Sequence, residues 1–234
     1  MSVVSVITPE SIAALYAESH DRVVHMVRDL GQGQTARPVP ATPRWTVHDL
    51  VAHLAAIPSD IVAGRLGGIP RPDETQAQVE ARRDRSVGDL LEEWADALGP
   101  VLEGARAGSI PAPLTIDVIT HEQDLRGALD VGHLDDDAAL RFATTGYCLG
   151  LTRRLAAAEL PPLRLRDPAR GFDETAGEGR PAATVQATEF DLFRALAGRR
   201  SRRQVAAFDW EGDPTPYLDV FCVFGPLPDT DIAD

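Results

Sequence analysis

The stretch TIDVITHEQDLR, residues 115–126, places a carboxylate and an imidazole on an otherwise apolar helix face. Asp117 and His121 are four residues apart, so on a helix their side chains point in the same direction. A polar side chain buried in an apolar stripe is costly unless it has a partner. Asp117 and His121 therefore pair with each other, or they share a metal ion with a third ligand from another helix. The apolar residues of the same face are Leu114, Val118, Leu125 and Ala128.

The third candidate ligand is His53, which lies on a helix predicted earlier in the chain. Thr46, followed three residues later by Asp49, is a variant of the capping box and predicts where this helix begins. Trp45, directly before the cap, is in the position of a hydrophobic staple. His53 flanks the apolar stripe of the helix, whereas His48 points well away from it. We therefore expect only His53 to face the interior.

A bundle core can bring His53, Asp117 and His121 together, and metal sites in helix bundles are built from such residues. Three nitrogen and oxygen ligands leave coordination positions open, which is the pattern of a catalytic site. The alternative is that His53 lies at a helix–helix seam and that Asp117 and His121 form a simple pair within one helix. Spacing alone favours this alternative slightly, because Asp and His four residues apart are a weak signal.

Other charged residues are candidates for supporting roles. Asp124 lies on the same side as His121 and is a candidate acceptor that orients this histidine, or else a solvated charge. Glu122 faces away from the stripe, and we expect it to be exposed to solvent. In the C-terminal part, Arg199 and Arg202 belong to a basic cluster over residues 194–203 that either binds an anionic group or is simply solvated.

The composition excludes several classes of function. The chain has 234 residues and a formal net charge of -13, which disfavours nucleic acid and anionic membrane surfaces as partners. No apolar run is long enough to span a membrane, and we expect a cytoplasmic protein. Two cysteines, Cys148 and Cys222, make no disulfide framework and are expected to be buried thiols. The glycine-rich and nucleophile motifs of common hydrolases, NTPases and dinucleotide enzymes are absent.

The pattern of elements changes near Pro161. Before this point the chain reads as a series of amphipathic helices, in one of which Pro100 should kink or end the helix. After it, residues 163–166 and 183–187 read as strands, residues 167–181 as loop, and residues 189–197 and 201–207 as short helices. The sequence therefore predicts a helical domain over residues 1–160 and a small α/β domain over residues 161–234.

Four stretches of the chain together resemble a known family. PRWTVHDLVAHL (residues 43–54) and DVITHEQDLR (residues 117–126) are similar to the two signatures of the DinB-like, mycothiol-dependent maleylpyruvate isomerase family. QVEARRDRSVGDLL (residues 78–91) is similar to the family's middle helix, and residues 189–214 to its C-terminal domain. Each motif is loose, but the combination is specific and covers most of the chain.

The resemblance implies a mainly α fold, a DinB-like four-helix bundle followed by a small α/β C-terminal domain. His53 and His121 match the family's two metal histidines, and Asp117 matches a position where the family usually has Glu. Because Asp is one methylene shorter, the metal must lie closer to the helix, or Asp117 must bind it through water. The implied cofactors are a divalent metal ion, usually zinc, and mycothiol or a related low-molecular-weight thiol.

The implied activity is a thiol S-transferase or isomerase that acts on an electrophilic small molecule. In this interpretation the metal ion favours the thiolate form of the thiol, the C-terminal domain closes over the site, and Arg199 or Arg202 contacts an anionic group. Two alternatives remain open. The protein is a non-catalytic metal- or ligand-binding or regulatory member of the same fold, or it is a metal-dependent hydrolase whose metal activates water.

Overall fold

The computed structural model describes residues 8–67, 70–134 and 137–233. Its internal contacts divide the chain into two compact units, one that ends at Leu134 and one over Asp135–Ala233. The helix α7 (Asp137–Ala157) belongs to the second unit, where it packs against a helix and a strand. The sequence pattern had assigned this helix to the N-terminal domain, because a long amphipathic helix fits a bundle as well as the face of a sheet.

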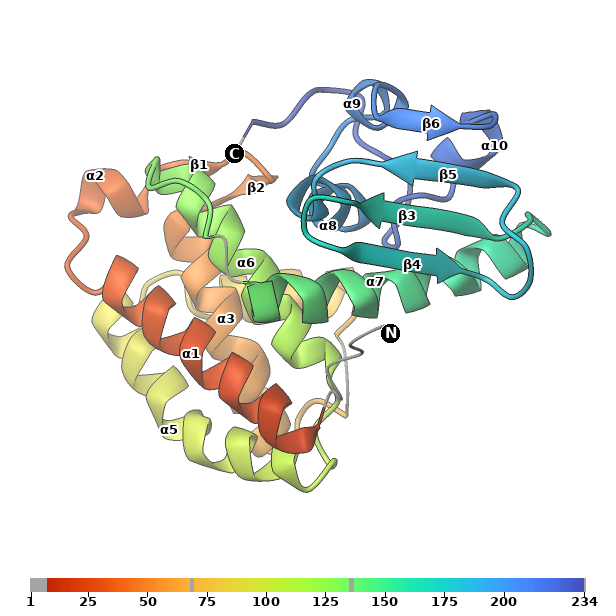
Figure 1. Cartoon of the computed structure of the whole chain (residues 1–234). Helices are drawn as coiled ribbons and strands as arrows, with labels where there is room; N and C mark the ends of the chain where they lie inside the picture. Colours follow the sequence, from red (N-terminus) through yellow and green to blue (C-terminus); the bar gives the residue numbers. More distant parts are fainter. Residues whose placement is uncertain (1–7, 68–69, 135–136, 234) are drawn as a thin grey trace. The chain divides into compact units, whose positions relative to one another are not determined.

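Over its described residues, the N-terminal unit is a four-helix bundle with two additional short helices. Figure 1 shows how the bundle helices lie beside one another. The bundle helices are α1 (Pro9–Val27), α3 (Val47–Val62), α5 (Val87–Arg106) and α6 (Pro113–Leu129). Both α1 and α3 pack against α5 and against α6. The remaining elements are α2 (Gln32–Thr35), the antiparallel strands β1 (Pro38–Val39) and β2 (Thr42–Thr46), and α4 (Pro72–Glu80), which packs on α3.

A side-chain cap begins α3 where the sequence predicts it. The Thr46 hydroxyl accepts from the Asp49 amide, and Asp49 in turn accepts from the Thr46 amide, which starts α3. The α5 helix does not end at Pro100 but continues to Arg106, contrary to one of the two predicted outcomes. Pro100 is exposed, so the carbonyl that loses its helical hydrogen bond can be solvated.

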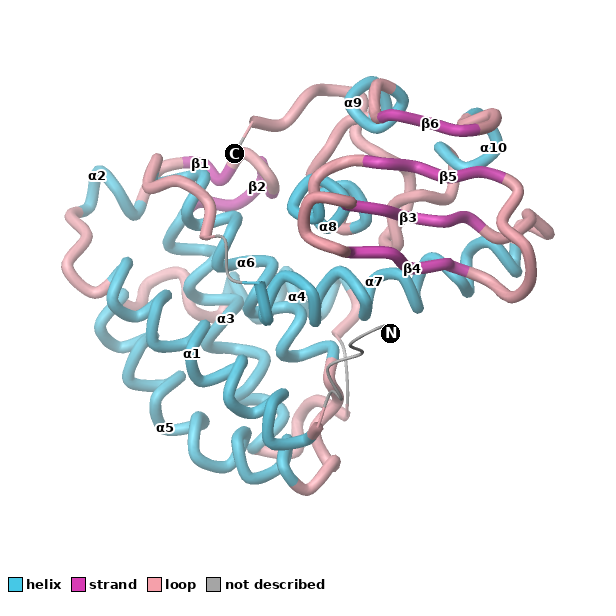
Figure 2. The backbone as a smooth tube through the Cα atoms, in the orientation of Figure 1, coloured by secondary structure: helices cyan, strands magenta, loops and turns pink. Residues whose placement is uncertain are grey.

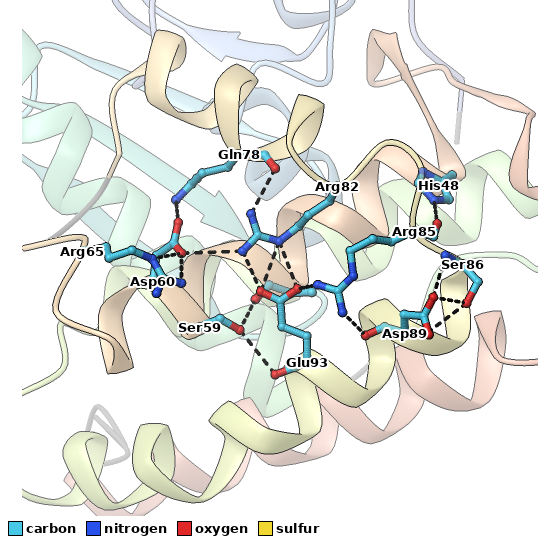
Figure 3. A network of polar contacts seen from close by, with 11 residues as sticks. His48, Ser59, Asp60, Arg65, Gln78, Arg82, Arg85, Ser86, Asp89 and Glu93 are labelled. Atoms are coloured by element: carbon cyan, nitrogen blue, oxygen red, sulfur yellow. Dashed lines mark hydrogen bonds and ion pairs between the residues drawn. The ribbon is translucent and has the colours of Figure 1, made fainter.

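A charged network attaches α4 and the segment after it to α3 and α5 (Figure 3). The Arg82 guanidinium forms an ion pair with Glu93 of α5 at 2.6 Å and lies 3.6 Å from Asp60 of α3. Asp60 also accepts a hydrogen bond from the Gln78 side chain of α4. Because Arg82, Glu93 and Asp60 have little exposed surface, these pairs hold α4 in one place more firmly than surface ion pairs would.

The C-terminal unit contains a mixed four-stranded sheet in the order β4-β3-β5-β6 (Figure 2). Its strands are β3 (Leu163–Asp167), β4 (Phe172–Ala176), β5 (Ala183–Gln186) and β6 (Asp209–Glu211). β3 pairs in parallel with β5, and the other two pairings are antiparallel. The helices of this unit, besides α7, are α8 (Glu189–Leu196), α9 (Arg202–Ala206) and α10 (Thr215–Leu218). β4 lies within a segment that was expected to be loop, and β6 was also not predicted.

These two units confirm the predicted fold class, a mainly helical N-terminal part followed by a small α/β part. None of the helices in the described residues combines the length and apolar character that crossing a membrane requires.

The prediction that Glu122 is exposed is wrong. Its side chain is 1% exposed, and its carboxylate accepts hydrogen bonds from Arg22 of α1 at 2.8 and 3.0 Å. Arg126, one turn further along α6, forms a second ion pair with it at 3.1 Å. More of the surface of α6 is thus buried than its apolar stripe indicates. The ion pairs of Glu122 allow this charged residue to lie in the buried part of the helix.

Replacing Glu122 with Ala is expected to lower the free energy of unfolding by about 3 kcal/mol, since it leaves Arg22 partly buried without its carboxylate. Urea denaturation followed by circular dichroism measures this loss. Glu18→Ala, at an exposed position of α1, is the control and should change stability by less than about 0.5 kcal/mol. Equal stability of both variants would show that the buried ion pair contributes nothing.

Candidate metal centre

Two adjacent bundle helices bring the three predicted ligands together. His53 lies in the middle of α3, and Asp117 and His121 lie one turn apart on α6. One potential ligand atom from each of the three residues lies within 4.8 Å of the other two. The α3 and α6 helices are in contact, so the grouping follows from the packing of the bundle. The structure therefore brings together the set that the sequence singled out.

The spacing of these atoms suits a small divalent ion. The Nε2 atom of His53 is 3.4 Å from Oδ2 of Asp117, and the Nε2 atom of His121 is 3.5 Å from Oδ1 of the same carboxylate. Ligand atoms at about 2.0–2.1 Å from a tetrahedral ion lie about 3.4 Å from one another. Two imidazole nitrogens and one carboxylate are ligands that zinc and several other divalent metals accept.

Burial differs among the three residues and defines the open side of the site. His53 and His121 are 4% and 7% exposed, whereas the side chain of Asp117 is 30% exposed. The two imidazole rings meet edge to face with their centroids 4.8 Å apart. Asp117 is therefore the side chain of the group with the most surface exposed to solvent.

Opposite charges determine the ionisation of the group. Burial acts to raise the pKa of Asp117, but the neighbouring His53 and His121 outweigh it and hold the pKa of this carboxyl well below its usual range. Burial acts to lower the pKa of His121, but Asp117 and Asp124 outweigh it, and the net effect is a raised pKa. Asp117 is therefore an anion at neutral pH and offers a negative charge to a cation.

Asp124 orients His121, which was one of its two predicted roles. The Nδ1–H group of His121 donates to Oδ2 of Asp124 at 2.8 Å, and Asp124 is 1% exposed. This hydrogen bond uses one ring nitrogen and leaves Nε2 facing Asp117. A carboxylate behind a metal-binding histidine fixes the ring orientation and raises its basicity as a ligand.

Sequence reasoning missed the role of Trp45 in this site. Its indole lies 5.0 Å from the His53 ring and 6.4 Å from the His121 ring, measured between centroids. The sequence marked Trp45 only as a residue next to a helix cap. Its position directly before the helix that carries His53 is the signal that could have revealed the contact.

The predicted arginine residues lie in the C-terminal unit. Arg199 donates to the carbonyl oxygen of Ala197 at 2.6 Å, and Arg202 forms an ion pair with Asp219 at 2.5 Å. In the same cluster, Arg194 is fully buried, and Arg200 and Arg203 form ion pairs with Asp191 and Asp231. Several members of the cluster are therefore engaged with acidic residues, and the binding of an anionic group by Arg199 or Arg202 stays a prediction.

In the metal-free protein, Asp124→Asn is expected to lower the pKa of His121, because it removes one of the two carboxylates that favour the imidazolium. The positive charge of His121 contributes its full stabilisation of the fold when the pH is below about 6.5, the ordinary pKa of histidine. This contribution is lost as the pH rises through the raised pKa of His121 in the folded protein. An NMR pH titration of the imidazole in the presence of a chelator measures the shift. Asp84→Asn, at an exposed position, is the control and should leave it unchanged.

Comparisons with known proteins agree with this architecture. No curated protein sequence matches the chain. The crystal structure of the mycothiol-dependent maleylpyruvate isomerase superposes with a TM-score of 0.55 at 14% identity, covering 85% of this chain and 92% of that one. A histidine-to-alanine mutant of that isomerase superposes with a TM-score of 0.57 at 13% identity, covering 90% of this chain and 96% of that one.

Because the sequence identity is low, these structural likenesses establish the fold alone. The sequence of the N-terminal unit adds independent information. Residues 16–126, which include His53, Asp117 and His121, match the family described as the mycothiol maleylpyruvate isomerase N-terminal domain. This match covers residues 16–126, so the N-terminal unit of the chain carries a domain of the mycothiol maleylpyruvate isomerase N-terminal domain family.

Proposed function

We propose that His53, Asp117 and His121 bind one divalent metal ion, and that this ion is zinc. The proposal is supported by the nitrogen-to-oxygen distances of 3.4 and 3.5 Å and by the chemistry of the donor set. The shorter side chain of Asp117 still reaches toward both imidazoles, which favours direct binding over binding through water. Asp124 supports the same assignment, because it leaves the Nε2 atom of His121 available.

We further propose that the protein is a metal-dependent thiol S-transferase or isomerase that uses mycothiol or a related low-molecular-weight thiol. The observation that carries this proposal is the partly exposed Asp117 between two buried imidazoles, in a domain of this family. A divalent ion held there supplies positive charge that favours the thiolate over the thiol. The thiol loses its proton to solvent, and its sulfur forms a bond with an electrophilic carbon of a small-molecule substrate. In a transfer, the bond from this carbon to a leaving group breaks, and the leaving group departs with the electron pair. In an isomerisation, the π bond of an activated alkene opens onto its electron-withdrawing group, and after rotation the returning electron pair re-forms the alkene and expels the thiolate.

The residues of the chain have separable tasks in this reaction. Asp124 keeps the His121 ring in one orientation, and the open side at Asp117 admits the thiol. Arg199 and Arg202 are the proposed contacts for an anionic group of the thiol or the substrate.

The sulfur must come from outside the protein. Cys148 and Cys222 are buried, and burial raises the pKa of both thiols. A thiol with a raised pKa is a poor source of thiolate at neutral pH. Both cysteines are therefore poor candidates for the nucleophile, which supports the proposal of an exogenous thiol.

Elemental analysis of the purified protein is expected to find about one divalent ion per chain, as a single three-ligand site requires. His53→Ala and His121→Ala should each lose it, whereas His48→Ala on the same helix as His53 should retain it. Asp117→Glu should retain the ion or bind it more tightly, and Asp117→Ala should bind it more weakly. Full occupancy in both histidine variants would contradict the site.

Adding a thiol to the Co²⁺-substituted protein is expected to produce a sulfur-to-metal charge-transfer band in the near ultraviolet. The band should persist in the Cys148→Ser/Cys222→Ser double variant, because neither cysteine supplies the sulfur, and should be absent in His121→Ala. Absorption titration with mycothiol or a small thiol mimic measures it. No spectral change at millimolar thiol would exclude the transferase and leave the non-catalytic or hydrolytic alternatives.

A further inference from the structure

Trp45 contacts both histidines of the candidate metal centre. Its ring centroid lies 5.0 Å from that of His53 and 6.4 Å from that of His121, with interplanar angles of 43° and 44°. The two histidine rings are themselves 4.8 Å apart. The three rings therefore form a closed triangle in which the indole restricts the rotation of both imidazoles.

Two independent contacts hold Trp45 itself in place. At the backbone, the next residue is Thr46, whose reciprocal hydrogen bonds with Asp49 fix the start of α3. At the side chain, the indole Nε1–H donates to Oε1 of Gln76 at 3.2 Å. Gln76 donates in turn to Glu80 at 3.0 Å, one turn along the same helix.

The helix that carries Gln76 is also anchored. Gln78, two residues further along α4, donates to Asp60 of α3, and Arg82 forms its ion pair with Glu93 of α5 (Figure 3). The acceptor for the indole therefore lies on a helix that side-chain contacts attach to α3 and α5. A rigid support of this kind lowers the number of conformations available to Trp45.

Trp45 also determines which side of the centre stays open. A half-buried indole beside both imidazoles covers that side with apolar surface, whereas Asp117 remains 30% exposed. Aromatic faces and edges in contact favour defined ring geometries over free rotation. Trp45 therefore places apolar surface beside both imidazoles, whereas the side chain of Asp117 is partly exposed to solvent.

We propose that Trp45 is a positioning residue of the metal centre, which holds the imidazoles of His53 and His121 in the orientation that binds the ion, and that Gln76 holds Trp45. The inference rests on the proposed metal site. Trp45 acts through the histidines and is not a ligand, since an indole N–H donates to Gln76 and offers no lone pair to a metal.

The test compares Trp45→Ala, Trp45→Phe and Gln76→Leu with the unchanged protein. Zn²⁺ affinity is measured by competition with a chromophoric chelator, and ligand geometry by the visible spectrum of bound Co²⁺. Trp45→Ala should bind Zn²⁺ about tenfold or more weakly and change the Co²⁺ spectrum, as removing the support of a metal-binding histidine does. Trp45→Phe, which keeps an aromatic ring, should recover most of the affinity, and Gln76→Leu should lie between the two.

Tryptophan fluorescence gives a second readout that does not depend on activity. Co²⁺ should quench the emission of the unchanged protein, and Trp45→Phe should lose the larger part of this quenching. Trp210→Phe is the matched control, because Trp210 lies in the C-terminal unit and donates to the carbonyl oxygen of Val205. It should retain both the quenching by Co²⁺ and the affinity for Zn²⁺.

The outcomes separate this inference from the metal site itself. If the unchanged protein binds no Zn²⁺, the proposed site is wrong. If it binds Zn²⁺ and a folded Trp45→Ala variant matches it in affinity and Co²⁺ spectrum, only the role of Trp45 is overturned. Should Trp45→Ala fail to fold by circular dichroism, Gln76→Leu decides, since wild-type affinity and spectrum in that variant overturn the proposed support.

Discussion

The attraction between the Asp117 carboxylate and two buried imidazoles is the interaction around which the N-terminal unit is arranged. Burying His53 and His121 without a charged partner would cost free energy, and Asp117 lies 3.4 and 3.5 Å from their Nε2 atoms. The contact requires α3 and α6 to lie side by side in one register. The cap at Thr46 fixes where α3 begins, and the hydrogen bond from His121 to Asp124 fixes the orientation of the His121 ring on α6. Both contacts help to keep the two imidazoles beside Asp117.

Local periodicity was enough to predict the directions of these three side chains. Asp117 and His121 are one turn apart on a single helix, so their common direction follows from helix geometry alone. The inward direction of His53 follows from a start signal at Thr46 and a count along the apolar stripe. Each of these inferences needs only a few neighbouring residues, but periodicity alone did not decide between a metal site and a simple pair within one helix.

Features that depend on distant partners could not be predicted in the same way. Glu122 is buried because Arg22 approaches from α1, about a hundred positions earlier in the chain. The contact of Trp45 with both histidines arises only when β2, α3 and α6 pack together. The strand β4 has a largely polar sequence, and its pairing with β3 rather than its own pattern makes it a strand. Tertiary packing decided all three cases.

The burial of both cysteines has a consequence for the proposed use of a thiol from solution. A pool of small thiol contains some of its oxidised, disulfide form, and an exposed protein thiolate would exchange with it to form a mixed disulfide. Two features protect Cys148 and Cys222 from this exchange. Both thiols are shielded from solvent, and burial raises the pKa of each. If the proposed chemistry holds, the redox state of the thiol pool can thus change without trapping the protein in a mixed disulfide.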